Sequence, residues 1–588
     1  MHAYDVILVY GVIIFIIVSL YFDLMGAGFT FLLGVTVLGV FGILTPKEML
    51  IGASNEQIAV ILLLLLLGNI YRKTALLDSL FDRIFVKISS HKAFTSRVML
   101  LIAPMSAFLN NTPLVALMMP YAYDWSKKHN QPISKILLPL SYAAILGGCA
   151  TLIGTSTNLI VNGMVIESGR ESLGLFDYTL IGGTMVVIGY LYMRFIGHRL
   201  LPSNYITSQN ITKNTRKYVV EAQISINSPL VGKTIEEAKL RNLDGLFLFQ
   251  IIRNDQEITA VPNDTILLQN DILLFAGETS SIADLFEQKK GLTMPSVGMF
   301  SRKKELDIVE IVVADGSLLV NKTLKSYNFR SKFDATVIAV HRNGEQIQGK
   351  LGAAKLKPGD TLLLLTGVRF GELASNSKDF YLISKVKEIR KLTPLQSWTL
   401  VIGTVSAIFL SSINVLSLFL ALIILISILL ILNVTNPKEL AKSIDYDLAF
   451  IIAMALALGV AMQKTGVAEI LGNVMIEIFR PWGNVGLLSG LYIITAILAA
   501  FVTNKAAVAL IFPIAISIAG DLGYNAIPFI LTVSFAAAAN FMTPIGYQTN
   551  TMVYGPGGYK FRDFIRVGTP LTIIYGIVTI FFLLKIYF

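Results

Sequence analysis

Cysteine is nearly absent from this sequence, and charged residues are scarce. Cys149 is the only cysteine among 588 residues, so the chain has no disulfide framework and no thiolate metal site. Charged residues make up 15% of the chain, whereas an average soluble domain has roughly 25%. The five histidines are scattered, and no cluster of His, Cys or carboxylate residues falls within the apolar runs. These absences argue against an enzyme.

Apolar residues, in contrast, dominate the sequence. They make up 54% of the chain, and the mean hydropathy is +0.67, which indicates an integral membrane protein. The net charge of +10 comes from Lys and Arg in the loops between apolar runs. That distribution is typical of the positive-inside pattern and does not favour nucleic-acid binding. The first apolar run, 6–20, lacks a basic segment before it, so we expect a retained span and no cleaved signal.

The apolar runs form two sets with the same internal order. Each set has three spans, a pair of short stretches around a polar break, a broken span and a closing span, and most approach the ~20 residues that cross a bilayer. The runs lie near 5–22, 28–44, 55–72, 96–126, 134–166 and 179–199, and again near 397–411, 414–433, 447–463, 485–518, 527–555 and 569–587. Amphipathic segments at 71–91 and 466–480 separate the third and fourth runs, and the first of them is expected to lie along a membrane surface.

Polar residues break both sets at corresponding places. The matched interruptions are Asn110-Asn111-Thr112 and Thr503-Asn504-Lys505 at the short stretches, then 151–158 and 543–550 in the broken spans. Gly154, Thr157 and Asn158 fall in register with Gly546, Thr549 and Asn550, 392 positions later. Paired polar breaks at membrane depth are a pointer to the binding site of a transporter.

The sequence therefore predicts a polytopic α-helical membrane protein built from two repeats, 1–204 and 391–588. We expect each repeat to contain a re-entrant hairpin and a broken helix. Five crossings per repeat make the two copies inverted. The basic loops lie on one side, which we assign to the cytoplasmic side of the plasma membrane.

A polar segment with short strand-like runs separates the repeats. It is itself duplicated, because Ser228-Pro229-Leu230-Val231-Gly232-Lys233-Thr234 resembles a stretch 89 residues later. We expect two small cytosolic α+β domains, at 205–290 and 291–390.

The polar breaks offer hydroxyls, amides, helix ends and one Lys, but no carboxylate. Free N–H groups at a broken helix favour an anion, and free C=O groups coordinate a cation. Such a set suits an oxyanion together with Na⁺. The alternative for any one residue is that its Ser, Thr or Asn side chain only bonds a neighbouring helix.

With these residues in view, the two repeats resemble the divalent anion:sodium symporter family of sulfate and di- and tricarboxylate carriers. The family carries a Ser-Asn-Thr tripeptide at each hairpin tip, and neither tripeptide here reads Ser-Asn-Thr. The resemblance implies an elevator-type dimer. It implies Na⁺ sites at Asn110, Asn111, Gly154, Thr155 and Ser156 and at Thr503, Asn504 and Met542. It implies substrate contacts at Asn111, Thr112, Asn504, Lys505, Thr543 and Pro544.

Lys505 is the main departure from that pattern. A Lys in the bilayer centre costs ~2.5–3.5 kcal/mol on insertion scales and needs a partner or a wet cavity. We hypothesise that it supplies fixed positive charge to a dianion and replaces one Na⁺. Proton coupling and snorkelling to an interface are the alternatives.

The inserted domains resemble the C-terminal domains of TrkA/RCK regulatory proteins (RCK-C). This resemblance rests on the 228–234 motif, the strand around Ile251 and the turn at Asp271. It implies pairing and a small regulator, such as a nucleotide, as a candidate ligand. A spacing or dimerising insert without a ligand is the alternative, and no Gly-rich dinucleotide loop is present.

The sequence thus predicts a Na⁺-coupled carrier of a small dianion, with sulfate favoured and no enzymatic cofactor. A di- or tricarboxylate symporter is the nearest alternative. An anion exchanger or extruder, an H⁺-coupled carrier and a gated channel are the others.

Overall fold

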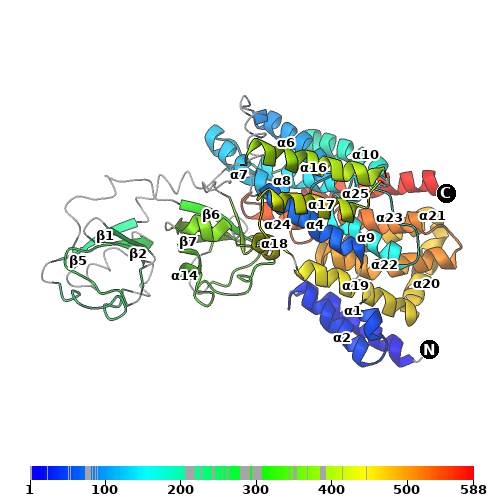
Figure 1. Ribbon diagram of the computed structural model, residues 1–588, viewed down its shortest axis with the longest axis horizontal. Helices are drawn as coiled ribbons and strands as arrows, with labels where there is room; N and C mark the ends of the chain where they lie inside the picture. Colours follow the sequence, from blue (N-terminus) through cyan, green and yellow to red (C-terminus); the bar gives the residue numbers. More distant parts are fainter. Residues whose placement is uncertain are drawn as a thin grey trace.

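The protein consists of a large helical body and two small β-sheets that extend from it. Figure 1 places the second sheet, with β6 and β7, between the helices and the first sheet. The computed structural model describes residues 3–588 except 23, 51, 53–54, 73–80, 82–83, 86–87, 89, 206–218, 226–227, 241–245, 254–255, 260, 263, 278–291, 294–307, 315, 343–344, 348–353, 367–368, 376, 384–391, 414 and 445.

The first group of helices precedes the sheets in the chain. It comprises α1 (Ala3–Tyr21), α2 (Ala27–Val40), α3 (Pro46–Met49), α4 (Glu56–Arg72), α6 (His91–Ser106), α7 (Asn111–His129), α8 (Ser134–Gly148), α9 (Ser156–Glu167), α10 (Thr179–Tyr192) and α11 (His198–Leu200). A π-helical turn, Met193–Gly197, joins α10 to α11. Most of the amphipathic segment expected at 71–91 lies outside the described residues.

The second group follows the sheets. It comprises α16 (Pro394–Ser412), α17 (Leu418–Ile431), α18 (Pro437–Ser443), α19 (Tyr446–Lys464), α20 (Val467–Phe479), α21 (Gly483–Phe501), α22 (Asn504–Asp521), α23 (Ile527–Ala538), α24 (Gln548–Tyr554) and α25 (Phe561–Tyr587). In both groups a helix begins at the polar tripeptide, and in both a helix resumes within or after the polar loop.

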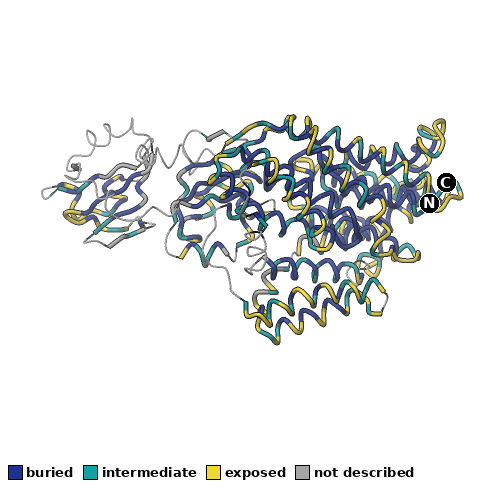
Figure 2. The backbone as a smooth tube through the Cα atoms, turned by 90° about the horizontal axis from the view of Figure 1, so that it is seen from above, coloured by how far each residue is buried: buried dark blue, intermediate teal, exposed yellow. Residues whose placement is uncertain are grey.

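Six helical segments in the described part of the chain are long and apolar enough to cross a membrane. The outward faces of several helices are apolar and exposed. On α25, for example, Ile573, Ile577 and Phe581 recur four residues apart and are all exposed. Figure 2 shows the complementary pattern, with buried residues toward the interior of the helical body and exposed ones outside. Such apolar outer faces fit a lipid environment, which confirms that this is a polytopic helical membrane protein.

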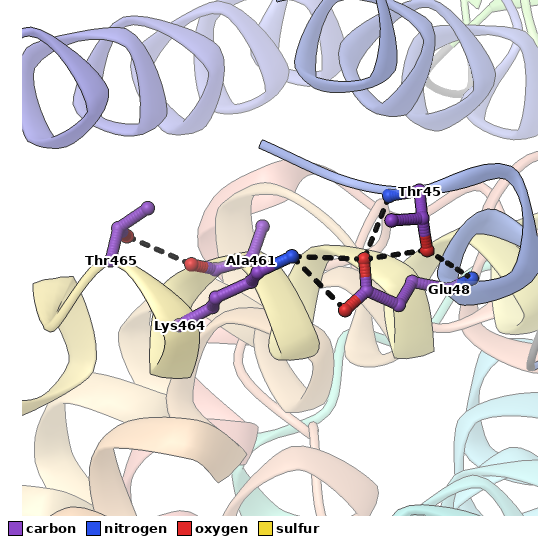
Figure 3. A network of polar contacts seen from close by, with 5 residues as sticks. All are labelled: Thr45, Glu48, Ala461, Lys464 and Thr465. Carbon is purple, nitrogen blue, oxygen red and sulfur yellow. Dashed lines mark hydrogen bonds and ion pairs between the residues drawn. The ribbon is translucent and has the colours of Figure 1, made fainter. Parts of the chain in front are cut away.

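Helices from the two groups pack against one another. α19 from the second group packs against α2 from the first, and α17 packs against α4. Figure 3 shows a further contact between the groups, where Lys464 at the end of α19 lies 3.1 Å from the carboxylate of Glu48 on α3. Thr45 caps α3 and donates to the same carboxylate from its backbone at 2.7 Å. These donors hold the pKa of Glu48 below its usual range, with the Thr45 backbone as the largest cause.

The two sheets have the same strand order. The first contains β1 (Val219–Ile224), β2 (Leu246–Arg253), β3 (Gln256–Thr259), β4 (Ile272–Gly277) and β5 (Leu292–Thr293), ordered β3-β2-β4-β1-β5. The second contains β6 (Ile308–Val313), β7 (Ala335–Arg342), β8 (Glu345–Gln346), β9 (Thr361–Thr366) and β10 (Phe380–Leu382). From the corresponding edge, its order is β8-β7-β9-β6-β10. Short helices α14 (Phe329–Phe333) and α15 (Phe370–Ser375) accompany the second sheet.

Matched ion pairs accompany these sheets. Arg253 pairs with Asp271 at 2.7 Å, and Arg342 pairs with Asp360 at 2.6 Å, 89 residues further along the chain. In both pairs the carboxylate side chain is almost fully buried, so the guanidinium supplies the charge that makes its burial tolerable. Each sheet is thus accompanied by a buried Asp that is paired with an Arg at the matching position.

The second sheet lies directly on the helical body. The Tyr123 hydroxyl on α7 donates to the Glu310 carboxylate on β6 at 2.6 Å. At the end of α24, a Cβ added to Gly555 would lie 2.2 Å from the Gly359 carbonyl oxygen, so the two backbones approach closely. Both α7 and α24 begin within the candidate site described next.

Candidate functional site

Two helices begin inside the helical body at the polar tripeptides. Asn110 is the N-cap of α7, and its side-chain oxygen accepts from the Thr112 N–H at 3.3 Å. Thr503 is the N-cap of α22, and its hydroxyl oxygen accepts from the Ala506 N–H at 3.1 Å. Asn and Thr are favoured at this position because their side chains satisfy a free N–H of the first turn. The remaining N–H groups favour negative charge at each tip.

The loops between α8 and α9 and between α23 and α24 are braced in the same way. The Thr151 hydroxyl donates to the Ala107 carbonyl and accepts from the Gly154 N–H at 3.2 Å. In the second loop the Thr543 hydroxyl donates to the Ala500 carbonyl at 2.7 Å. It accepts from the Gly546 N–H at 3.1 Å. Each loop is therefore fixed to the end of the helix that precedes a polar tripeptide, α6 for the first loop and α21 for the second.

An asparagine then closes each loop and links the two halves of the body. The Asn158 side chain donates to the Thr151 carbonyl at 2.9 Å, and its oxygen accepts from Ser534 on α23 at 3.0 Å. The Asn550 side chain donates to the Thr543 carbonyl at 3.1 Å, and its oxygen accepts from Ser141 on α8 at 2.7 Å. Each broken helix is thus held by a serine from the other half.

Asn111 is the most highly connected amide at the first tip. It is buried, and its neighbours are satisfied when its nitrogen donates to the Ala144 carbonyl at 3.1 Å and the Gly154 carbonyl at 3.3 Å. Its oxygen then accepts from the Tyr547 hydroxyl at 2.6 Å. Ser106 is also hydrogen-bonded to this amide.

The Tyr547 hydroxyl also joins the two loops. Besides donating to Asn111, it lies 3.1 Å from the Thr155 hydroxyl. Beside it, the Thr112 hydroxyl donates to the Gln548 side-chain oxygen at 3.1 Å. The first tip, the first loop and the start of α24 therefore meet at one point.

The second tip has fewer contacts. Asn504 is buried, and its side-chain oxygen has no partner among the described residues. Lys505 is half-buried and forms no ion pair or hydrogen bond with any described residue. No hydrogen bond in the described part of the chain joins either side chain to the first tip.

The other expected site residues lie in the loops. Ser156 begins α9 and is half-buried, as is Met542. The Pro544 carbonyl accepts from the Thr551 hydroxyl at 2.6 Å, and the Thr543 hydroxyl is engaged in bracing. Gly154 lies against the Gly148 and Ser106 backbone, where a Cβ would come within 2.9 Å of the Ser106 carbonyl oxygen.

Sequence reasoning missed Tyr547, Gln548 and Asn540. The signal for the first two was present, because the register that aligns Gly154 with Gly546 also aligns Thr155 and Ser156 with Tyr547 and Gln548. Tyr and Thr are dissimilar residues in a sequence comparison, although the Tyr547 hydroxyl lies beside the Thr155 hydroxyl in the structure. Asn540 has no polar counterpart, because Gly148 occupies the matching position.

The chemistry of the site follows from its side chains. Among the described residues of the two tips and two loops, Lys505 carries the only formal charge, and no described group of His, Cys, Asp or Glu is arranged to hold a metal ion. Helix N-termini, amide donors and one cation suit an anion, whereas the amide and carbonyl oxygens suit an alkali cation.

Comparison with known proteins agrees with this chemistry. A family model described as "Citrate transporter" matches residues 12–492 and 483–588. An uncharacterized transporter of Synechocystis is 31% identical, over 99% of this chain and 97% of its own length. A putative sulfur deprivation response regulator of Chlamydomonas reinhardtii is 32% identical, over 93% of this chain and 95% of its own. Sodium/sulfate cotransporter 1 of the same alga is 23% identical, over 94% of this chain and 86% of its own.

These matches span the whole chain, including the inserted sheets. They confirm the resemblance to divalent anion:sodium symporters and the expectation of a transporter, not an enzyme. The chain belongs to the citrate transporter family.

Proposed function

We propose that this protein is a secondary active transporter that carries sulfate or a similar small dianion across the plasma membrane together with Na⁺. The observation that carries the proposal is that two helix N-termini and two unwound loops within the helical body offer neutral oxygen and amide groups, with Lys505 as the only formal charge among their described residues. A fixed cation suits a compact dianion better than a neutral substrate. A relative described as a sodium/sulfate cotransporter supports the same substrate and ion.

The proposed architecture is a pair of inverted repeats, 1–204 and 391–588, working as an elevator in a homodimer. The tips at Asn110–Thr112 and Thr503–Lys505 would be re-entrant, because the helices on both sides of each tip come together inside the body. Matching braces at Thr151 and Thr543 support the duplication. The proposed substrate contacts come from both tips and the second loop, with Tyr547 and Gln548 as further neighbours of the first tip. They are Asn111, Thr112, Asn504, Lys505, Thr543 and Pro544.

The inserted domains, 205–290 and 291–390, are proposed to be cytosolic RCK-C domains that regulate transport. Their shared strand order and matched Arg–Asp pairs support a duplicated module. The contact of the second sheet with α7 and α24 provides a physical route from the module to the site. A nucleotide-type ligand is the candidate regulator.

A di- or tricarboxylate is the second candidate substrate, because the matching family model is described as a citrate transporter. The larger carboxylates would use the same N-termini and Lys505. The sequence-based alternatives of anion exchange and H⁺ coupling are tested in the same experiment.

The test is uptake of labelled sulfate into proteoliposomes that contain the purified full chain, with and without an inward Na⁺ gradient. Succinate and citrate are added as competitors. We expect Na⁺-driven sulfate uptake that succinate inhibits weakly. Uptake driven by a proton gradient would indicate H⁺ coupling in place of Na⁺ symport. Uptake that requires an anion loaded inside the vesicles would indicate anion exchange. Absence of sulfate uptake with strong uptake of citrate would assign the site to carboxylates.

A further inference from the structure

Basic side chains gather at a cleft between three helices, at the end of α6 that is opposite the first tip. α6, α8 and α10 pack against one another, and Figure 1 shows them together. The cleft is lined by five basic side chains, which are His91, Lys92, Lys135, Arg194 and His198. No Asp or Glu of the described residues lines it. The cleft therefore carries positive charge that its own walls do not balance.

These basic groups also lack partners in the part of the chain that the structure describes. The side chains of Lys92, Lys135 and Arg194 form no ion pair or hydrogen bond with any described residue. His91 Nδ1 lies 3.1 Å from the Gln131 side-chain oxygen, which leaves the buried Nε2 without a described partner. The ring of His198 lies 5.1 Å from that of His91, between centroids. Like charges gathered in one cleft repel, and a bound anion relieves that repulsion.

Two helix N-termini add to the positive character of the cleft. α6 begins at His91 and α8 begins at Ser134, and neither helix has a side-chain cap. The N–H groups of a first turn carry partial positive charge and favour an anion. The helix ends and the side chains thus favour the same kind of ligand.

The surface beside the cleft indicates which anion binds. Val187, Leu191 and Arg194 follow at steps of four and three residues, so they lie on one face of α10 and its π-helical continuation. Val187 and Leu191 are exposed, as is Leu100 on α6, four residues after Ser96 in the cleft wall. A phospholipid has a charged phosphate and apolar chains, and it can use both surfaces. A soluble phosphate gains nothing from the apolar faces.

From these observations we propose that the cleft between α6, α8 and α10 binds the headgroup phosphate of an anionic phospholipid. Lys92 and Arg194 are exposed at its rim, and Lys135 is half-buried, so the three would hold the phosphate oxygens. A protonated His91 ring would supply a further donor. The acyl chains would lie along the exposed apolar face of α10. This site is separate from the proposed transport site and needs no transported ion.

The tendency of Lys and Arg to gather at one face of a membrane is the simpler explanation for the exposed charges. It does not explain why Lys135 is half-buried in the same cleft as the unpartnered nitrogen of His91. The experiment must therefore distinguish a defined site from diffuse surface charge.

The first test measures the thermal unfolding of the purified full chain in a neutral detergent. Phosphatidylglycerol is added to the micelles over a range of contents, with phosphatidylcholine of the same chain length as reference. A ligand that binds only the folded state raises the melting temperature with its concentration. We expect phosphatidylglycerol to stabilise the wild type more than phosphatidylcholine does. Lys135→Gln and Arg194→Gln should each raise the half-maximal phosphatidylglycerol content by about fivefold, as for loss of one basic contact to an anionic headgroup.

Lys128→Gln is the matched control, because Lys128 is an exposed cation in the last turn of α7 and does not line the cleft. Its response should equal that of the wild type. Lys92→Gln changes an exposed side chain, so it tests the cleft without disturbing the interior, and it should shift the response as Arg194→Gln does. A wild type that responds equally to both lipids, or cleft variants that respond like Lys128→Gln, would overturn the assignment.

A second arm separates a lipid from a soluble phosphate. Inorganic phosphate replaces the lipid at constant ionic strength, and we expect the wild type and Arg194→Gln to respond alike. Stabilisation of the wild type but not of Arg194→Gln would assign the cleft to a soluble anion and defeat the lipid proposal. Native mass spectrometry gives an independent readout. The wild type should retain more phosphatidylglycerol molecules per chain than Arg194→Gln, and equal retention would contradict the proposal.

Discussion

At the scale of single residues, Lys505 stands out because no described residue neutralises it. Its half-buried place at the start of α22 puts it beside the N–H groups of that turn, which also carry partial positive charge. Two like charges at one helix end are unfavourable without an anion between them. A bound anion would offset both charges, which is why the substrate proposal depends on this side chain.

Lys505→Thr tests that dependence, because Thr is the residue at the matching position of the first tip. We expect the KM for the transported dianion to rise by at least about tenfold, since a contact between full charges is lost. Lys505→Arg keeps the charge and should stay closer to the wild type. The measurement is initial uptake in proteoliposomes over a range of anion concentrations. Equal KM values for Lys505→Thr and the wild type would mean that the side chain does not contact the substrate.

At the scale of elements, the two unwound loops are kept in place by close backbone contacts at glycine. A Cβ added to Gly546 would lie 2.7 Å from the Ala499 carbonyl oxygen and 2.0 Å from the Asn540 side-chain nitrogen. At Gly154 a Cβ would lie 2.5 Å from the Gly148 carbonyl oxygen. Neither loop can move away easily, because Thr151 and Thr543 fix the loops to the ends of α6 and α21.

Gly546→Ala should therefore destabilise the protein by about 1–3 kcal/mol, the usual cost of overpacking a tight interior. The loss should appear as a lower melting temperature in detergent. Gly520→Ala on α22 is the control, because no atom lies within 4 Å of the added Cβ. That change should be neutral or stabilising by up to ~1 kcal/mol, since Ala is favoured over Gly within a helix. If both variants melted like the wild type, the loop would be less constrained than its contacts indicate.

The elements were largely predictable from sequence, whereas their pairing was not. Hydropathy located the helices on both sides of each tripeptide, because an apolar run long enough to cross a bilayer has few other folds. The polar breaks located the loops. The bond from Ser141 to Asn550, however, joins positions in different halves, and periodicity carries no information about such partners. Tyr547 was missed because only identical residues of the two halves identify the matching positions, and Tyr547 matches Thr155.

At the scale of the whole molecule, the second sheet connects three parts of the helical body. Through Glu310 it contacts α7, and near Gly359 it contacts the end of α24. The Lys378 ammonium donates to the Ile444 carbonyl, next to α18, at 2.7 Å. Movement of α7 or α24 relative to α18 must therefore strain or release this sheet. Such a coupling would provide a mechanical basis for the proposed regulatory role of the inserted domains.

Glu310 makes the contact with α7 sensitive to pH. Burial raises the pKa of its carboxyl above the usual value, and the Tyr123 hydroxyl and Lys127 oppose that shift only in part. A raised pKa means that the contact is most stable when Glu310 is protonated. Its contribution is complete below the ordinary pKa of ~4.3 and is lost as the pH rises through the raised value.

Glu310→Gln should remove this dependence, because a neutral amide resembles the protonated acid and still accepts from Tyr123. We expect the variant and the wild type to melt alike at low pH and the variant to become relatively more stable as the pH rises.

Glu237 provides the control. Its carboxylate accepts from the Thr234 N–H at 2.8 Å, and the Thr234 backbone is the main cause of its lowered pKa. Glu237→Gln should therefore lose stability relative to the wild type as the pH rises. If the wild type instead became more stable than Glu310→Gln as the pH rises, the carboxylate would be stabilised in its charged form. The contact would then hold the sheet to α7 at neutral pH and above.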